Sequence, residues 1–179
     1  METFYFKDDQ FPFEGVGENR LVARAIVLDD RYRVALHTVR RFDLGMPYEQ
    51  TYFETPGGGV DEGETIETAA VRECEEELGY EIEILCPLAI VDDFYNVIKR
   101  HNENHYFLAR RKERIGVHFV SEGDTLIIDT RYYPIEEAIA LVEGQDDKFI
   151  SGLVRQRELP ILRLAAVEIA KMKAKEGRE

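Results

Sequence analysis

The chain alternates short apolar runs with clusters of turn residues. Residues 21–28 and 33–39 are rich in Val, Ala, Ile and Leu and flank Asp29 and Asp30, so they are predicted to form a β-hairpin. Further short strands are predicted at residues 51–55, 81–91, 105–109 and 125–128. Loops or turns are predicted at residues 41–50, at the breaker 56–59 and at the basic segment 110–114.

Three other segments carry helical signals. Residues 64–78 contain many Glu and Ala, with Thr65 placed as an N-cap and Gly79 as a C-terminal stop. Proline suits the first turn of a helix, so Pro134 and Pro160 are each predicted to begin one. The second of these is predicted to form the C-terminal helix, over residues 159–175.

Strands interrupted by helices predict a mixed α/β fold in which helices cover a sheet. The length fits one domain over residues 1–179, in which residues 1–20 form an irregular lead-in or an edge strand. A chain of 179 residues with 44% hydrophobic content can bury its own core. The sequence therefore favours a globular protein over a disordered one.

Composition also argues against several classes of protein. The chain contains no run of about 18 apolar residues, so a membrane protein is not expected. Its N-terminus lacks the cationic and apolar regions of a signal peptide, so secretion is not expected either. Two cysteines, Cys74 and Cys86, are too few for a disulfide scaffold and indicate a reduced, cytoplasmic protein.

The acidic excess is concentrated in one stretch. The formal net charge is −13, and residues 54–83 hold 11 acids against the single base Arg72, so this stretch carries −10. A chain this acidic repels nucleic-acid backbones, which argues against a duplex-binding module. A local cluster of carboxylates is compatible with divalent cations that bridge the protein to a small phosphorylated substrate.

The acids of the helix at 64–78 share one side. With Glu73 at 0° on a helical wheel, Glu77 falls near ~40° and Glu76 near ~300°. An apolar arc near ~100–160° on the same wheel holds Val71, Cys74 and Leu78. On the acids alone, a solvated helix face is the favoured interpretation, with a site for Mg²⁺ as the alternative. The preceding glycines, at residues 57–59, let the backbone approach a ligand closely and therefore favour the metal site.

The whole stretch also matches a named pattern. The spacing G-x5-E-x7-R-E-U-x-E-E-x-G-U, with U an apolar residue, is met by Gly58, Glu64, Arg72, Glu73, Glu76, Glu77 and Gly79. The two apolar positions hold Cys74, which behaves as a small hydrophobe, and Tyr80, whose ring is largely apolar. The pattern resembles the box of the Nudix hydrolase family. The resemblance implies an α/β/α sandwich around a mixed β-sheet.

The resemblance further implies metal-dependent hydrolysis of a nucleoside diphosphate linked to another moiety. It assigns Mg²⁺ or Mn²⁺ to Glu73, Glu76 and Glu77, with the carbonyl of Gly57 as a further ligand and Glu64 in support. Arg72 is expected to orient a box glutamate, so Glu73, Glu76 and Arg72 form the expected catalytic set. For the general base, the sequence leaves four candidates open: Glu76, Glu122, Asp146 and Asp147.

The substrate is not resolved by the sequence. Arg24, Arg40 and Arg41 either reach phosphates or are exposed charges, and Tyr95 either packs in the core or contacts substrate. In the resembled family a tyrosine placed like Tyr95 occurs in diadenosine polyphosphate hydrolases. The candidates are ADP-ribose or another nucleotide sugar, a dinucleoside polyphosphate and a nucleoside triphosphate. A small nucleotide is therefore the expected partner, and a homodimer is compatible with the sequence.

Two other classes of function share the fold. One is a non-hydrolytic sensing or regulatory domain, which usually lacks some of the box glutamates that this chain retains. The other is an isopentenyl diphosphate isomerase, which relies on a cysteine motif in which neither Cys74 nor Cys86 lies.

Overall fold

A computed structural model describes residues 1–119 and 123–176 of the chain. Its main feature is a mixed β-sheet with the strand order β1-β6-β7-β2-β3-β4, in which β5 pairs with β2 and β8 with β3. The strands are β1 (Glu2–Phe6), β2 (Glu18–Leu28), β3 (Val34–Arg41), β4 (Gln50–Glu54), β5 (Gly57–Gly59), β6 (Tyr80–Tyr95), β7 (Arg100–Arg114) and β8 (Ile127–Tyr133). The helices are α1 (Ile66–Leu78), α2 (Ile135–Gly144) and α3 (Phe149–Glu176), with 3-10 turns η1 (Asn96–Ile98) and η2 (Gly123–Leu126).

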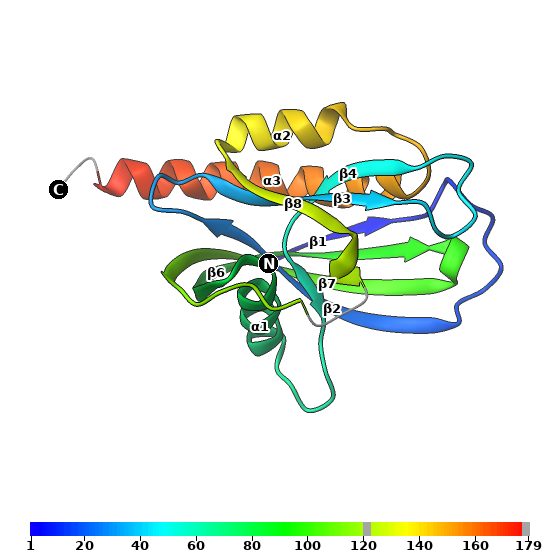
Figure 1. Cartoon of the computed structure of the whole chain (residues 1–179), viewed down its shortest axis with the longest axis horizontal. Coiled ribbons are helices and arrows are strands. Elements are labelled where there is room, and N and C mark those ends of the chain that lie inside the picture. Colours follow the sequence, from blue (N-terminus) through cyan, green and yellow to red (C-terminus); the bar gives the residue numbers. More distant parts are fainter. Residues whose placement is uncertain (120–122, 177–179) are drawn as a thin grey trace.

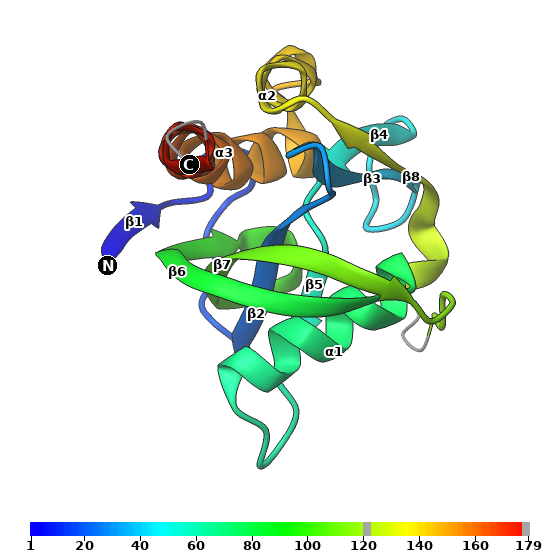
Figure 2. The ribbon, with the colours of Figure 1, turned by 90° about the vertical axis from the view of Figure 1, so that its left-hand side faces the viewer.

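The sheet divides into a large part and a small part. In the large part, β2 runs parallel to β7, from Glu18↔Arg100 to Leu28↔Arg110, and β7 runs antiparallel to β6. The predicted hairpin of β2 and β3 is present, but the two strands pair only at Leu28↔Val34. Beyond this point β3 pairs with β4 and β8, and these three strands form the small part, which lies apart from β6, β7 and β2 in Figure 2.

Helices cover both faces of the large part of the sheet (Figures 1 and 2). Along β2, Ala23, Ala25 and Val27 pack against α1, while Ile26 and Leu28 belong to the core beneath α2 and α3. This alternation follows from the two-residue period of a strand, and it explains why β2 is apolar almost throughout. The predicted α/β/α sandwich around a mixed sheet is confirmed.

Helix α1 begins and ends where the sequence predicts. The Thr65 hydroxyl accepts a hydrogen bond from the Thr68 N–H at 3.1 Å, as an N-cap does. Gly79 has a left-handed conformation with φ of 71°, and its N–H donates to the Glu75 carbonyl at 2.8 Å. Both ends of the helix are therefore fixed by local chemistry.

The C-terminal helix differs from its prediction. Helix α3 begins at Phe149, and Pro160 lies inside it rather than at its start. An internal proline removes one backbone hydrogen bond and costs about 3 kcal/mol in an isolated helix. Here Leu153 and Val154 before the proline and Ile161 after it are buried, so packing keeps the helix continuous through that position. Among the described residues, no helix is long and apolar enough to cross a membrane.

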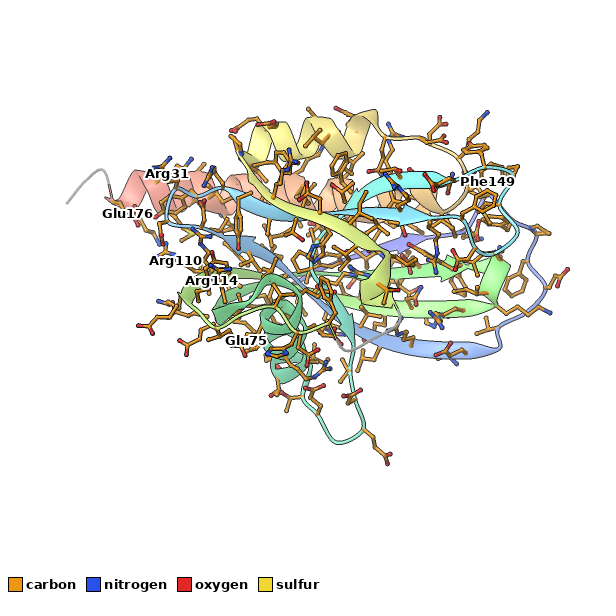
Figure 3. The ribbon with its side chains drawn as sticks, viewed as in Figure 1. Arg31, Glu75, Arg110, Arg114, Phe149 and Glu176 are labelled. Atoms are coloured by element: carbon orange, nitrogen blue, oxygen red, sulfur yellow. The ribbon has the colours of Figure 1, made fainter. Side chains whose placement is uncertain are left out.

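Three further segments are more regular than predicted. The lead-in contains the edge strand β1, which pairs in parallel with β6, and β2 begins already at Glu18. The breaker glycines form β5, because they pair with β2. The predicted basic turn at residues 110–114 is part of β7, whose cations face acidic and aromatic residues: Lys112 pairs with Glu83, and Arg111 lies over the Tyr80 ring. Figure 3 shows Arg110 and Glu176 toward the opposite end of the molecule from Phe149.

Candidate active site

The glycine strand β5 lies in close contact with its neighbours on both sides. Gly57 has a φ of 138°, and a Cβ there would lie 2.3 Å from the Ala23 carbonyl oxygen, so only glycine fits. A Cβ on Gly58 would lie 2.4–2.6 Å from the carboxylate atoms of Glu73. The box glycines therefore bring the backbone against strand β2 on one side and against the carboxylate helix α1 on the other.

Arg72 connects the acids at the start of the box to those on the helix. Its Nε and Nη2 donate to the two carboxylate oxygens of Glu64 at 3.0 and 2.9 Å, and Nη2 also donates to the Gly59 carbonyl at 3.0 Å. Its Nη1 donates to Glu73 Oε1 at 2.9 Å and lies 3.6 Å from Glu76 Oε2. The arginine thus contacts both Glu64 and Glu73, and its hydrogen bonds hold the pKa of Glu64 below the usual range.

Glu77 is held by other partners. Its side chain is 6% exposed, and its Oε2 accepts hydrogen bonds from the Gly57 N–H at 2.8 Å and from His37 Nε2 at 3.0 Å. On the other side of the imidazole ring, His37 Nδ1 lies 2.7 Å from the Thr130 hydroxyl. Strands β3, β5 and β8 therefore all meet the last turn of α1 at this carboxylate.

The donor set suits a hard divalent cation. Glu73, Glu76 and Glu77 offer carboxylate oxygens, and Glu73 lies against the backbone of Gly58, with the Gly57 carbonyl one residue away. Burial raises the pKa of Glu73 despite Arg72, and repulsion from Glu77 and Glu76 adds to the rise. A bound cation would remove that repulsion. Among the described residues, no group of three His, Cys, Asp or Glu side chains forms a preformed metal cluster. Arg72 instead holds Glu73, and His37 holds Glu77.

A cavity of about 450 Å³, within the range of small-molecule sites, opens beside Glu73 and Glu77. The described residues that line it include five arginines, namely Arg20, Arg24, Arg41, Arg100 and Arg157, and three glutamates, namely Glu54, Glu73 and Glu77. Apolar side chains line another part of it: Val39, Leu44, Ile98, Leu126, Ile127 and Val154. In a chain of net charge −13, this excess of cations at one cavity favours an anionic ligand.

Strands β2 and β7 supply much of the cavity wall because of their pairing. Residues two apart on a strand point to the same face, and Arg20, Val22 and Arg24 of β2 all line the cavity. On β7 the same holds for Arg100, Asn102 and Asn104. The parallel register places Arg20 beside Asn102 and Val22 beside Asn104, so the two rows form one polar wall.

A buried network of charges forms another wall. Arg157 of α3 donates to Glu54 Oε2 at 2.8 Å, to Glu158 Oε1 at 2.7 Å and to the Tyr95 hydroxyl at 3.1 Å. Arg24 lies 3.6 Å from Glu54. Burial of Glu54 opposes ionisation, yet Arg24 and Arg157 together hold its pKa below the usual range. Glu54 is therefore a fixed anion between two buried guanidinium groups.

The predicted substrate residues fall into two groups. Arg24 and Tyr95 line the cavity, and Tyr95 is also a buried partner of Arg157. Arg40 lies outside the cavity, where it is exposed and pairs with Glu49 at 3.4 Å, while Arg41 lines the cavity. The side chains of β3 alternate, so these adjacent arginines point to different faces of the strand.

Two of the predicted loop bases, Asp146 and Asp147, do not line the cavity beside the carboxylates. Asp146 accepts a hydrogen bond from the Tyr48 hydroxyl at 2.7 Å, outside the cavity, and Asp147 also lies outside it. Glu122 lies outside the described residues. Of the four candidate bases, Glu76 is the one placed beside Arg72 and the other box acids.

The polar residues of the site that the sequence reasoning did not assign include Arg20, His37 and Arg157. Arg20 escaped because the strand was predicted to begin at residue 21; with β2 beginning at Glu18, the two-residue alternation places Arg20 with Arg24. His37 carried a usable signal, since it follows directly on the apolar run Val34, Ala35 and Leu36 in β3. Arg157 carried none, because only the packing of α3 against β4 and β6 brings it to the cavity.

Comparisons with known proteins agree with this geometry. The family model of the NUDIX domain matches residues 18–153. A curated relative, the "Putative 8-oxo-dGTP diphosphatase" of Bacillus subtilis (strain 168), is 33% identical over 110 residues. That alignment covers 56% of this chain and 66% of the relative, so the chain spans just under two thirds of the relative's length.

Two solved structures have the same fold. A NUDIX hydrolase from Nitrosomonas europaea superposes with a TM-score of 0.58 at 18% identity, covering 78% of this chain and 85% of that one. A MutT NUDIX hydrolase from Burkholderia pseudomallei superposes with a TM-score of 0.51 at 27% identity, covering 66% and 85%.

Proposed function

We propose a function from the premise that this chain belongs to the NUDIX domain family, whose model matches most of its length. The proposed activity is hydrolysis of the diphosphate linkage in a nucleoside diphosphate derivative, with Mg²⁺ or Mn²⁺ as the cofactor. The observation that carries the proposal is that two box carboxylates, Glu73 and Glu77, line the same cavity as five arginines. The carboxylates suit a divalent cation, and the arginines suit the phosphates that such a cation would accompany.

The metal would be held by Glu73, Glu76 and Glu77, with the Gly57 carbonyl as a further ligand and Glu64 in support. A bound cation would neutralise charge on the phosphate oxygens and lower the pKa of a water molecule. The chain's own residues do the positioning. Arg72 fixes Glu73, and its bidentate contact with Glu64 fixes Arg72 in turn. Arg20, Arg24 and Arg41 line the cavity and would bind phosphate oxygens along it.

Glu76 is the proposed general base. Its side chain is 22% exposed at the edge of the carboxylate cluster, so a water molecule can approach it. Its neighbour Arg72 lies 3.6 Å away and would help to orient the carboxylate. Arg40, originally a candidate for phosphate binding, faces away from the cavity, and we assign that role to Arg41 instead.

The substrate is proposed at the level of a class. The Bacillus subtilis relative is named as a putative 8-oxo-dGTP diphosphatase, so ordinary and oxidised nucleoside triphosphates are the first substrates to test. Nucleotide sugars such as ADP-ribose and dinucleoside polyphosphates come next. The free thiols of Cys74 and Cys86 suit a reducing compartment, so the cytoplasm is the proposed location.

The test is a substrate panel read by product identity, with Mg²⁺, with Mn²⁺ and with chelator. We expect turnover of at least one compound with a metal and none with chelator. Glu76→Gln and Glu77→Gln should abolish turnover while circular dichroism stays normal. Glu67→Gln is the matched control, because Glu67 is an exposed acid in the first turn of the same helix and lies outside the cluster.

The rival function is a non-hydrolytic sensing domain with the same fold. It predicts that nucleotides bind without turnover across the whole panel with either metal. Retained turnover in both glutamine variants would instead contradict the metal assignment and leave the hydrolase standing.

A further inference from the structure

We propose that His37 and Thr130 form a positioning pair that fixes Glu77 for the metal, an inference that rests on the proposed function. Both residues lie outside the box, on the neighbouring strands β3 and β8. His37 reaches Glu77 with Nε2 at 3.0 Å and Thr130 with Nδ1 at 2.7 Å. The imidazole is therefore held at both of its nitrogen atoms.

The carboxylate of Glu77 is fixed through one of its two oxygens. Oε2 accepts from the Gly57 N–H and from His37 Nε2, and these donors come from two different strands, β5 and β3. Two donors on Oε2 set the rotation of the carboxylate about its last bond, which leaves Oε1 for a cation. Because Glu77 is only 6% exposed, water cannot readily replace either donor.

Thr130 contacts the nitrogen of His37 that does not face Glu77. Nε2 faces a carboxylate oxygen, so it must carry a hydrogen to bond with it. The Thr130 hydroxyl can donate to Nδ1, which keeps the hydrogen of a neutral ring on Nε2. His37 and Thr130 are direct cross-strand partners in the β3–β8 ladder, so the pairing of the strands sets this contact.

The pair complements the clamp made by Arg72. Arg72 holds Glu73 from within the box, whereas His37 holds Glu77 from the small part of the sheet. Partners of this kind around a metal ligand typically change metal affinity by about 10–100-fold when removed. A purely structural role, in which His37 only joins β3 to β8, predicts a loss of stability with no change in metal affinity.

Two matched pairs of variants separate these roles. His37→Gln keeps an N–H donor at the position of Nε2, while His37→Leu removes it. Thr130→Ser keeps the hydroxyl, while Thr130→Val removes it at nearly constant shape. The readout is Mn²⁺ affinity of the folded protein without substrate, followed by electron paramagnetic resonance of free Mn²⁺, with urea unfolding measured in parallel.

We expect His37→Leu and Thr130→Val to weaken Mn²⁺ binding by about 10-fold or more. His37→Gln and Thr130→Ser should stay within about threefold of the wild type. If Leu and Val variants bind Mn²⁺ as the wild type does, or if His37→Gln is as weak as His37→Leu, the proposal is overturned. Should His37→Leu fail to fold, the Mn²⁺ affinities of Thr130→Ser and Thr130→Val test the proposal instead.

The same experiment separates this proposal from the hydrolase assignment. A wild type that binds Mn²⁺ but hydrolyses no compound overturns the proposed function and leaves the positioning pair to be judged by the variants. A wild type that binds no Mn²⁺ overturns the positioning pair directly.

Discussion

Replacing Gly58 by alanine should impair activity far more than stability. An added Cβ would lie 2.4 Å from Glu73 Oε2, whereas ordinary contacts begin near 3.4 Å, so the carboxylate must move by about 1 Å. A displacement of this size in a catalytic group can cost about 100-fold in rate. The clash involves the end of the flexible Glu73 side chain rather than backbone atoms, so a rotation of that side chain relieves it at little cost in stability.

The stability terms for Gly58→Ala nearly cancel. Alanine restricts the unfolded chain and stabilises by about 0.4–1 kcal/mol where the backbone conformation is compatible. Loss of the hydrogen bond between Arg72 and Glu73 costs about 1 kcal/mol. The free energy of unfolding should therefore change by less than about 1 kcal/mol.

The adjacent Gly57→Ala should behave in the opposite way. Its φ of 138° is strained for alanine, which costs about 1–3 kcal/mol. The added Cβ would also lie 2.3 Å from the Ala23 oxygen and 2.6 Å from the Arg24 Cα, and forcing backbone atoms apart adds about 1–3 kcal/mol. With a urea dependence of about 1–3 kcal/mol per M, the unfolding midpoint should fall by at least about 0.7 M.

The assay is urea unfolding together with metal-dependent turnover of the best substrate in the panel. Gly144→Ala serves as the control, because a Cβ there meets nothing within 4 Å. Wild-type turnover by Gly58→Ala would refute the need for Glu73 at its present place. A wild-type unfolding midpoint for Gly57→Ala would refute the close approach of β5 to β2.

Two further predictions concern buried acids. Glu158 is fully buried and accepts hydrogen bonds from Arg157, Thr55 and Tyr106, so Glu158→Gln should destabilise the protein by about 3 kcal/mol. The control Glu168→Gln, on the exposed part of α3, should change stability by less than about 0.5 kcal/mol. Equal urea midpoints for the two variants would contradict the buried network. Burial raises the pKa of Asp93, so the folded state binds its proton more tightly than the unfolded state and this group's contribution to stability falls as pH rises above the usual value of 3.8. Asp93→Asn should therefore gain stability over the wild type between pH 4 and pH 7, as followed by the unfolding midpoint against pH, and a constant difference would show that Asp93 does not titrate in this way.

The sequence by itself determined the box and the elements next to it. The N-cap Thr65, the left-handed Gly79 and the periodicity between them are local signals, so α1 and its carboxylate face were predicted correctly. The apolar runs of β2 and β3 on either side of Asp29 and Asp30 likewise predicted a hairpin, and strands interrupted by helices predicted a sheet covered by helices. These features depend on interactions within a few residues, which a sequence displays directly.

Tertiary structure decided the rest. Pro160 stays inside α3 because buried side chains on both sides of it outweigh the lost backbone hydrogen bond. Arg157 reaches the cavity because α3 packs against β4 and β6, and His37 meets Glu77 because β3 crosses the end of α1. Such contacts join residues that are 40 to 103 positions apart, so no local pattern encodes them, and only the packed fold brings them together.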